Sequence, residues 1–331
     1  MRKNNIARCC GWQRNAGLTL VELMVSMMLS LFVILAATSL LLTSKSAYTA
    51  NEDAVMIQES GRHALEIVTR ALHQAGHEDW GRTGAAGITA AVGSAGIIGL
   101  DARSLKSTSP AMETPLKKNV NGSDVLGIRF HGAGTGDHGD GTMLNCAGFG
   151  VPSGPNGGAT DERGWSIFFV AEDATGEPEL RCKYQGKSSW TAVAIARGIE
   201  SFQVLYGVDA DADGLANMYI PAAEVDKLDE GLTLTGADQA ELALDKNRKS
   251  HWKKVVAVKV ALLMRGAHAV RPDDAGKSYD LFGKDYGDDS GATDAGTRIE
   301  EKSLPAKSRI RIRKTFNATI QLRNQSLGSP A

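Results

Sequence analysis

The chain has 331 residues, in which 37 lysines and arginines stand against 38 aspartates and glutamates. This even balance argues against a protein that binds nucleic acid over much of its surface. Glycine is abundant, at 37 residues, and this abundance indicates an exported domain that is rich in loops.

The first long apolar stretch runs from Leu18 to Leu42, and Glu22 is its one charged residue. At about 1.5 Å per residue, a helix of this length crosses the ~30 Å hydrocarbon core of a bilayer. The preceding leader, residues 1–17, carries basic residues and no acidic one. By the positive-inside rule we expect the leader to stay in the cytoplasm and the remainder to lie across the membrane.

Two alternatives for this stretch are a signal anchor and a secretory signal peptide that is removed. A secretory signal has an apolar core of roughly 7 to 15 residues, followed by an A-x-A-like cleavage site. Here the apolar run is longer and Gly17 stands before it, so cleavage at Gly17 keeps the helix attached to the domain. The order of the residues therefore favours an anchor that is processed but retained.

Gly17 followed by Leu18-Thr19-Leu20-Val21-Glu22 resembles the processing site of type IV pilin and pseudopilin precursors. Those precursors have a short basic leader ending in glycine, then a hydrophobic helix with glutamate at its fifth position. The resemblance implies cleavage between Gly17 and Leu18 by a prepilin peptidase, and N-methylation of Leu18. It also implies a single-pass inner-membrane protein with a periplasmic domain, and a place in the pilus fibre or at its tip. Leu18 stands where the family most often has phenylalanine.

Glu22 lies one turn into the apolar helix. A carboxylate there costs at most about 2.5 to 3.5 kcal/mol. After cleavage, the α-amine of Leu18 is a positive charge in the same apolar layer. We expect such an amine to pair with Glu22 of a neighbouring subunit in a helical bundle and to offset this cost. The alternative is that the Glu22 side chain reaches the lipid headgroups.

Beyond Leu42 the chain stays free of proline as far as Ala75 and becomes amphipathic, which predicts one continuous helix that ends at Gly76. The sequence therefore divides into a leader, two halves of a helix and a globular domain. These parts are the leader (1–17), the transmembrane half-helix (18–42), the amphipathic half-helix (43–76) and the globular β-rich domain (77–331).

Six segments of the globular domain have the patterns of β-strands. We expect the last three of them to form one half-buried antiparallel sheet. With the helix packed on an antiparallel sheet, the expected fold is α+β and type IV pilin-like, with large glycine-rich loops. The acidic, glycine-rich segment 271–296 is expected to be exposed and mobile. The predicted strands are 123–132, 165–173, 178–185, 199–207, 252–266 and 309–324.

The globular domain is similar to the PilW group of minor pilins in three blocks taken in order, namely 197–220, 252–263 and 322–324. The resemblance implies a pilus-assembly protein, not an enzyme, that joins other minor pilins in priming pilus growth. Twitching motility, adhesion and DNA uptake would follow indirectly. The implied partners are the prepilin peptidase, other minor pilins, the major pilin and a pilus-tip adhesin.

Two other functions share parts of these patterns. A minor pseudopilin of a type II secretion system would have the same amino terminus. A bitopic receptor or enzyme would keep its leader. Against an enzyme, the sequence has no G-x-S-x-G elbow, no H-E-x-x-H motif, and no serine or cysteine with a clear base partner.

The four cysteines divide by topology. Cys9 and Cys10 are adjacent in the leader, a spacing that disfavours a bridge between them. Cys146 and Cys182 lie in the exported part, where one disulfide is expected to stabilise the domain by roughly 3 to 4 kcal/mol. A zinc site is the alternative, but no C-x-x-C spacing supports it.

Asp209, Asp211 and Asp213 alternate and are followed by glycine, as at the start of a D-x-D-x-D-G calcium loop. Alternate spacing lets these carboxylates converge on one Ca²⁺ ion, and Asn217 occupies the ninth position of such a loop. The twelfth position holds Ile220 in place of a bidentate glutamate. A solvated acidic turn is therefore the alternative to a calcium site.

Lys307, Arg309, Arg311 and Arg313 alternate within the last predicted strand, which would place them on one face of it. This basic stripe could meet DNA, but no aromatic residues for base stacking are interleaved with it. An exposed strand face, or a sheet edge protected by charge, is favoured instead. We therefore do not expect direct binding of nucleic acid.

Overall fold

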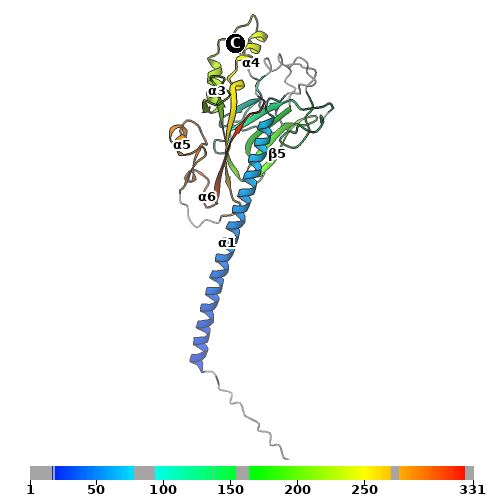
Figure 1. Cartoon of the computed structure of the whole chain (residues 1–331). Helices are drawn as coiled ribbons and strands as arrows, with labels where there is room; N and C mark the ends of the chain where they lie inside the picture. Colours follow the sequence, from blue (N-terminus) through cyan, green and yellow to red (C-terminus); the bar gives the residue numbers. More distant parts are fainter. Residues whose placement is uncertain are drawn as a thin grey trace, which may run out of the picture. The chain divides into compact units, whose positions relative to one another are not determined.

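The computed structural model of the chain describes residues 17, 19–77, 94–136, 138–153, 164–269 and 276–324. The chain divides into two compact units, residues 1–49 and 50–331. Within the second unit, the end of a long helix packs on antiparallel sheets, which confirms the predicted α+β class (Figure 1).

Helix α1 (Leu20–Gln74) is continuous, as its proline-free sequence predicts. It stops where Gly76 adopts a φ of +67°, a left-handed conformation that favours glycine. At this end the side-chain amide of Asn324 donates to the carbonyl of His73 (3.1 Å), so the last described residue caps the helix. The buried residues of α1 are Asp53, Ile57, Gly61, Ala64, Val68, Ala71 and Leu72.

Asp53 is the one charged residue on the buried face of α1. Its carboxylate accepts a hydrogen bond from the backbone N–H of His268 (2.9 Å) and lies 2.8 Å from Nδ1 of the same residue. A buried carboxylate needs such partners, because an unpaired one would be costly to desolvate. These contacts of Asp53 therefore attach α1 to the loop that follows strand β8 (Val255–Arg265).

The first sheet contains the antiparallel strands β1 (Ile97–Leu100), β2 (Val125–Phe130), β3 (Gly164–Glu172), β4 (Pro178–Gln185) and β5 (Trp190–Arg197), in this spatial order. Strands β2, β3 and β4 confirm the predictions for 123–132, 165–173 and 178–185. Strand β5 has no counterpart among the predicted strands, because its alternating alanines give no clear apolar face.

The second sheet contains, in spatial order, β11 (Arg313–Gln321), β8, β6 (Ile199–Val208) and β7 (Met218–Ile220), all antiparallel. The predicted strands 199–207, 252–266 and 309–324 were expected to share one antiparallel sheet, and this is confirmed, since β6, β8 and β11 lie in it. Gly198, with a φ of +81°, is the single residue between β5 and β6, where the chain passes from one sheet to the other. Alternation within each strand carries no information about which strands pair, so this change of sheet left no pattern to detect.

Strand β8 is buried on both faces, whereas the sequence predicted a half-buried sheet. One face contributes Val258, Val260 and Leu262 to the main core, which also includes the buried face of α1. On the other face, Ala261 and Leu263 form a smaller cluster. Their partners are Leu281, Ile299 and Leu304.

The second cover of β8 comes from residues 276–304, which form β9 (Ser278–Asp280), α5 (Lys284–Ser290), β10 (Arg298–Glu300) and the 3-10 helix η2 (Glu301–Ser303). The prediction of an exposed, mobile segment is therefore wrong for 276–296, and residues 271–275 lie outside the described residues. The segment is acidic in composition, and its few apolar residues, which contact the sheet, form no pattern that predicts their burial. Acidic residues are also paired within the segment, since Arg298 donates a hydrogen bond to Asp280 (2.5 Å) across the β9–β10 pair.

Helices between β7 and β8 were not predicted, namely α3 (Ala222–Glu230), α4 (Gln239–Lys249) and the 3-10 helix η1 (His251–Lys254). Trp252 attaches them to the core, since its ring packs edge-on against Tyr206 with centroids 4.8 Å apart. The indole N–H of Trp252 also donates to Asp226 on α3 (2.9 Å). This side chain therefore links the helices to β6.

Gly61 lies where α1 crosses β11. A methyl group added there would overlap the ring of Phe316, which is itself buried. We expect Gly61→Ala to lower the unfolding free energy by about 1 to 3 kcal/mol through overpacking, although alanine favours a helix by about 1 kcal/mol. Urea unfolding would measure the change. In a Phe316→Leu background the same substitution should cost less or become stabilising, and an unchanged cost would contradict this explanation.

Lys183 is a buried cation on the face of the five-stranded sheet that carries Ile167 and Phe169. Its ammonium donates to the hydroxyl of Ser109 (3.0 Å) and lies 5.6 Å from the ring centroid of Trp190. Burial lowers the pKa of Lys183 to about 8, and the nearby Glu113 opposes this effect only in part. At neutral pH the domain therefore holds a charge that its surroundings disfavour.

The pKa of Lys183 predicts an unusual pH dependence. Its folded-state pKa of about 8 lies below the ordinary value of 10.5. Between these values the unfolded chain binds more protons, so this group makes stability rise with pH. We expect the unfolding free energy of the wild type to rise between about pH 8 and 10, relative to that of Lys183→Met. Lys106→Met, at an exposed lysine, is the matched control, and parallel profiles for wild type and Lys183→Met would contradict the prediction.

Candidate assembly site

Helix α1 begins at a reciprocal pair of contacts between Thr19 and Glu22. The Glu22 carboxylate accepts hydrogen bonds from the backbone N–H and the hydroxyl of Thr19, both at 3.0 Å. In return, the backbone N–H of Glu22 donates to the Thr19 hydroxyl (3.2 Å). This arrangement is a capping box, which satisfies N–H groups that the first turn of a helix leaves without partners.

The capping box was not recognised in the sequence, although Thr-x-x-Glu directly before an apolar run is its signature. It gives Glu22 a local role in addition to the predicted contact with a neighbouring amine. Gly17, on one side of the predicted cleavage site, is exposed, and a Cβ atom added there would contact none of the described residues. Leu18, on the other side, lies outside the described residues, so cleavage and methylation stay predictions.

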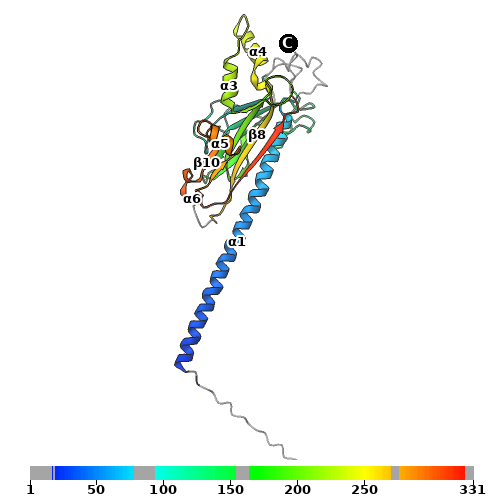
Figure 2. The ribbon, with the colours of Figure 1, turned by 60° about the vertical axis from the view of Figure 1, so that its left-hand side comes forward.

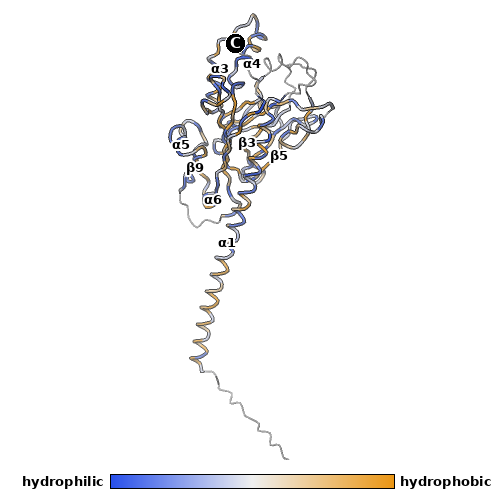
Figure 3. The backbone as a smooth tube through the Cα atoms, viewed as in Figure 1, coloured by the Kyte–Doolittle hydropathy of each residue, from blue (hydrophilic) through white to orange (hydrophobic). Residues whose placement is uncertain are grey.

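The first half of α1 is long and apolar enough to cross a membrane. Figure 3 shows the apolar residues along this part of the helix. Its side chains are exposed, including those of Leu20, Phe32 and Leu42. An apolar helix without a protein partner needs lipid or other helices around it, because exposed apolar area in water is unfavourable.

The predicted disulfide between Cys146 and Cys182 is present, with Cα atoms 5.9 Å apart. It ties the loop after β2 to the middle of β4, where Cys182 is fully buried. The loop is also held by a hydrogen bond from the Cys146 N–H to the Ser166 hydroxyl (2.9 Å). Phe149 in the same loop packs against Tyr184 with ring centroids 5.3 Å apart. The bridge therefore orders part of a glycine-rich loop.

The predicted calcium ligands Asp209, Asp211 and Asp213 converge after β6, with one oxygen of each within 4.8 Å of the others. The loop is closed by its own hydrogen bonds. Asp209 accepts from the backbone N–H of Ala212 (2.7 Å) and of Gly214 (2.8 Å). The fourth predicted ligand, Asn217, accepts from the backbone N–H of Ala210 (2.6 Å). Calcium binding stays a prediction, and a self-closed acidic turn fits the same geometry.

Titration calorimetry of the purified chain with Ca²⁺ tests this loop. If the three carboxylates bind Ca²⁺, we expect saturable heat with a Kd of about 10⁻⁴ to 10⁻³ M, as in extracellular modules. Asp213→Asn should weaken that binding. Asp238→Asn, on the separate helix α4, should not change it. An absence of heat at millimolar Ca²⁺ would leave the acidic turn as the correct interpretation.

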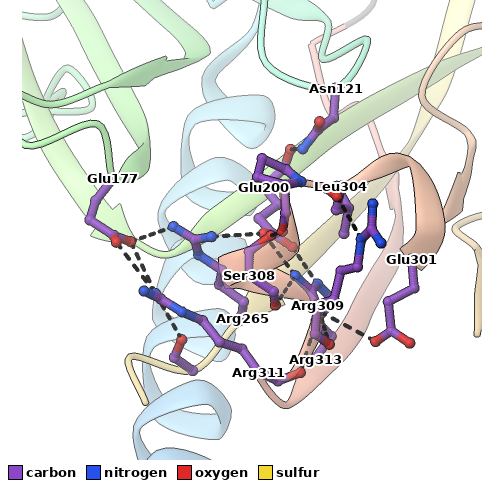
Figure 4. Close-up of polar contacts among 12 residues, drawn as sticks. Asn121, Glu177, Glu200, Arg265, Glu301, Leu304, Ser308, Arg309, Arg311 and Arg313 are labelled. Atoms are coloured by element: carbon purple, nitrogen blue, oxygen red, sulfur yellow. Dashed lines mark hydrogen bonds and ion pairs between the residues drawn. The ribbon is translucent and has the colours of Figure 1, made fainter. Parts of the chain in front are cut away.

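A buried network of arginines and glutamates joins both sheets to the carboxy-terminal segment (Figure 4). Arg313 donates two hydrogen bonds to Glu200 (2.6 and 3.1 Å) and lies 3.4 Å from Glu301. Arg265 on β8 donates to the same Glu200 (3.1 Å) and also pairs with Glu177, in the turn between β3 and β4. The side chains of Arg313 and Glu301 have no exposed surface.

The network shows that the predicted basic stripe is wrong. Lys307 and Arg309 lie in the short helix α6 (Ala306–Arg309), and Arg311 precedes β11, so these residues share no strand face. Arg311 contacts Glu177 (3.3 Å), and Arg313 is buried. The carboxylates that hold these arginines are distant in sequence, and alternation along one strand cannot reveal them.

Both ends of the chain match known protein families. The family described as "Prokaryotic N-terminal methylation motif" matches residues 12–38, and "Type IV Pilus-assembly protein W" matches residues 167–324. The carboxy-terminal part of the chain is thus similar to the PilW family of type IV pilus-assembly proteins, and its amino terminus carries a methylation motif. The second match contains the whole four-stranded sheet, the arginine–glutamate network and the acidic loop.

At the amino terminus, the methylation motif implies processing by a prepilin peptidase and assembly with other pilins. The PilW family is one of pilus-assembly proteins, which are structural and not catalytic. Among solved structures, a type IV-like pilin from Thermus thermophilus is similar at 12% sequence identity, covering 81% of this chain and 97% of that chain with a TM-score of 0.37. No curated protein matches the chain.

Proposed function

We propose that the protein is a minor pilin that takes part in priming and assembly of type IV pili at the inner membrane. This proposal rests on one observation, that a single chain contains both a pilin-like amino-terminal helix and a domain similar to pilus-assembly proteins. An apolar helix opens with the Thr19–Glu22 capping box directly after Gly17, and the same helix enters a domain similar to the PilW family. A helix of this kind serves assembly, because its apolar side chains need lipid or neighbouring helices.

The proposed topology follows from charge. The leader, residues 1–17, is basic and would stay in the cytoplasm, while the domain would be exported to the periplasm. The Cys146–Cys182 disulfide fits an oxidising compartment. After cleavage between Gly17 and Leu18, the new amine and Glu22 would lie in the same membrane layer.

The proposed assembly step is the pairing of Glu22 with the amino terminus of an adjacent pilin. Within one chain the Glu22 carboxylate already accepts two hydrogen bonds from Thr19. A carboxylate has about four acceptor sites, so capping leaves positions for an ammonium group. The partners in this step would be other minor pilins and the major pilin. A tip adhesin would bind at a later step of pilus assembly.

Deletion of the protein in its native host tests the function. We expect surface pili, counted by electron microscopy, to be lost and to return when the full chain is supplied. Protein secretion should be unaffected. Normal piliation with failed secretion would instead identify a minor pseudopilin of a type II system. Mass spectrometry should find a mature terminus that begins at methylated Leu18, and a terminus at Met1 would contradict both pilin functions.

A further inference from the structure

Strand β11 has an open edge. It is the outer strand of the four-stranded sheet and pairs with β8 along its whole length without a register shift. At its two ends, the Gly266 N–H donates to the Ile312 carbonyl (2.9 Å) and the Leu322 N–H donates to the Val256 carbonyl (2.9 Å). In an antiparallel pair such bonds recur at every second residue. The even-numbered residues of β11 therefore bond to β8, and the odd-numbered residues direct their main-chain groups outward.

The outward groups belong to Thr315, Asn317, Thr319 and Gln321. Among the described residues, none makes a main-chain hydrogen bond to this edge. Proteins usually protect a long edge with a charge, a bulge or a short length. The strands β1 and β7 are short, and β5 has a register shift in its pairing. Strand β11 has nine residues, no bulge, and a lysine, Lys314, that instead donates to Gln58 on α1.

A groove adjoins this edge. Its volume is about 430 Å³, and it lies between the end of α1 and the end of β11, which run beside each other (Figure 2). Two of its lining residues, His73 and Arg323, are basic, and none is acidic. The lining residues are Thr69, His73, Thr319, Ile320, Gln321, Leu322 and Arg323.

The charges near this edge indicate which kind of protein segment can bind to it. Apart from Arg313, which is buried and paired with Glu200, the segment up to Asn324 contains two cations, Lys314 and Arg323, and no carboxylate side chain. Two copies of β11 paired antiparallel would bring cations together and would offer no carboxylate to either copy. Like charges at adjacent positions destabilise a strand pair. The edge therefore fits an acidic strand from a different protein better than a second copy of this chain.

We propose that the β11 edge and its groove bind an extended segment of a neighbouring pilin subunit, with a carboxylate of that segment near Arg323. The inference rests on the proposed function, which supplies the neighbouring subunit. The added strand would hydrogen-bond to the outward groups of β11, and its side chains would cover the groove. Main-chain bonds would supply affinity, and the carboxylate would select the partner.

Site-specific photo-crosslinking of the full chain in its native host tests the proposal. A benzophenone amino acid at Gln321, in the groove, should give a crosslinked product that contains another pilin. The same probe at Ala240, exposed on α4, should give no such product. Thr319→Pro removes an outward N–H but keeps the bonds to β8, so the product should fall by about tenfold or more. Thr319→Ala keeps the N–H and should leave the product unchanged.

Arg323→Glu is an independent variant that does not alter the main chain. It should repel the partner's carboxylate and reduce the Gln321 product, even if Thr319→Pro fails to fold. A product that survives both folded variants, a product with a second copy of this chain, or no product in piliated cells would each overturn the inference. Its failure is distinct from failure of the proposed function, because only the latter would leave the deletion strain fully piliated.

Discussion

Replacing Arg313 by leucine is expected to lower the free energy of unfolding by about 3 to 5 kcal/mol, the usual cost of removing one partner from a buried ion pair. The guanidinium of Arg313 holds Glu200 and lies near Glu301. It also donates to the Ser308 carbonyl at the end of α6 (2.7 Å). Without it, buried carboxylate oxygens would lose partners in a place that water does not reach. Urea unfolding of the oxidised, detergent-solubilised chain would measure the change.

Arg311→Leu is the matched control, two residues away and with the same chemical change. Its partner Glu177 is 39% exposed, and the Arg311 side chain itself is 19% exposed. The expected cost is no more than about 1 kcal/mol, as for pairs that water still screens. The double variant Arg313→Leu with Glu200→Leu should recover part of the loss. Equal costs for Arg311→Leu and Arg313→Leu would show that burial of the network is not what stabilises the domain.

Glu22→Gln and Glu22→Ala are both expected to be cleaved normally and to fail in assembly. Glutamine can replace glutamate in a capping box, but it has no charge to meet the amine of a neighbouring subunit. Loss of one charged hydrogen bond, worth about 1.5 to 3 kcal/mol, corresponds to a decrease of at least about tenfold in association. Co-purification of each variant with other pilins from membranes would measure association, and mass spectrometry would measure cleavage.

Thr19→Ala separates the two roles of Glu22. It removes both hydrogen bonds that involve the Thr19 hydroxyl and keeps the charge of Glu22. We therefore expect Thr19→Ala to assemble better than Glu22→Gln. The opposite order, with Glu22→Gln close to wild type and Thr19→Ala defective, would show that the capping of α1 and not the charge decides assembly.

The long amino-terminal helix of this molecule is predictable because its signals are local. Gly17 and Glu22 lie five residues apart, the apolar helix is one uninterrupted run, and the helix stop is a single glycine. The Cys146–Cys182 bridge was predictable for a different reason, since these are the two cysteines outside the leader and they have few other ways to pair. Strands with strong alternation, such as β6 and β8, were likewise found within a few residues of their observed bounds.

The rest depends on residues that meet only in three dimensions. Nothing near Arg313 in the sequence indicates that Glu200, 113 positions away, will neutralise it. Leu281 lies in an acidic, glycine-rich segment, and its burial depends on the odd face of β8, which is visible only once the sheet is formed. Strand β5 has no clear apolar face in its sequence, and it pairs with β4 over its length. Each of these errors has the same origin, a long-range contact that overrides local composition.

The contact between Asn324 and His73 joins residues 251 positions apart, and it sets an order for folding in the cell. Contacts so distant in sequence form slowly, because the chain between them must first be closed into a loop. Helix α1 emerges first during synthesis, whereas β8 and β11, which cover its buried face, emerge near the end. Ile57, Val68 and Leu72 must therefore stay uncovered until synthesis of the chain is nearly complete. During that interval the unfinished chain is prone to aggregation, and a chaperone that shields the helix would raise its yield.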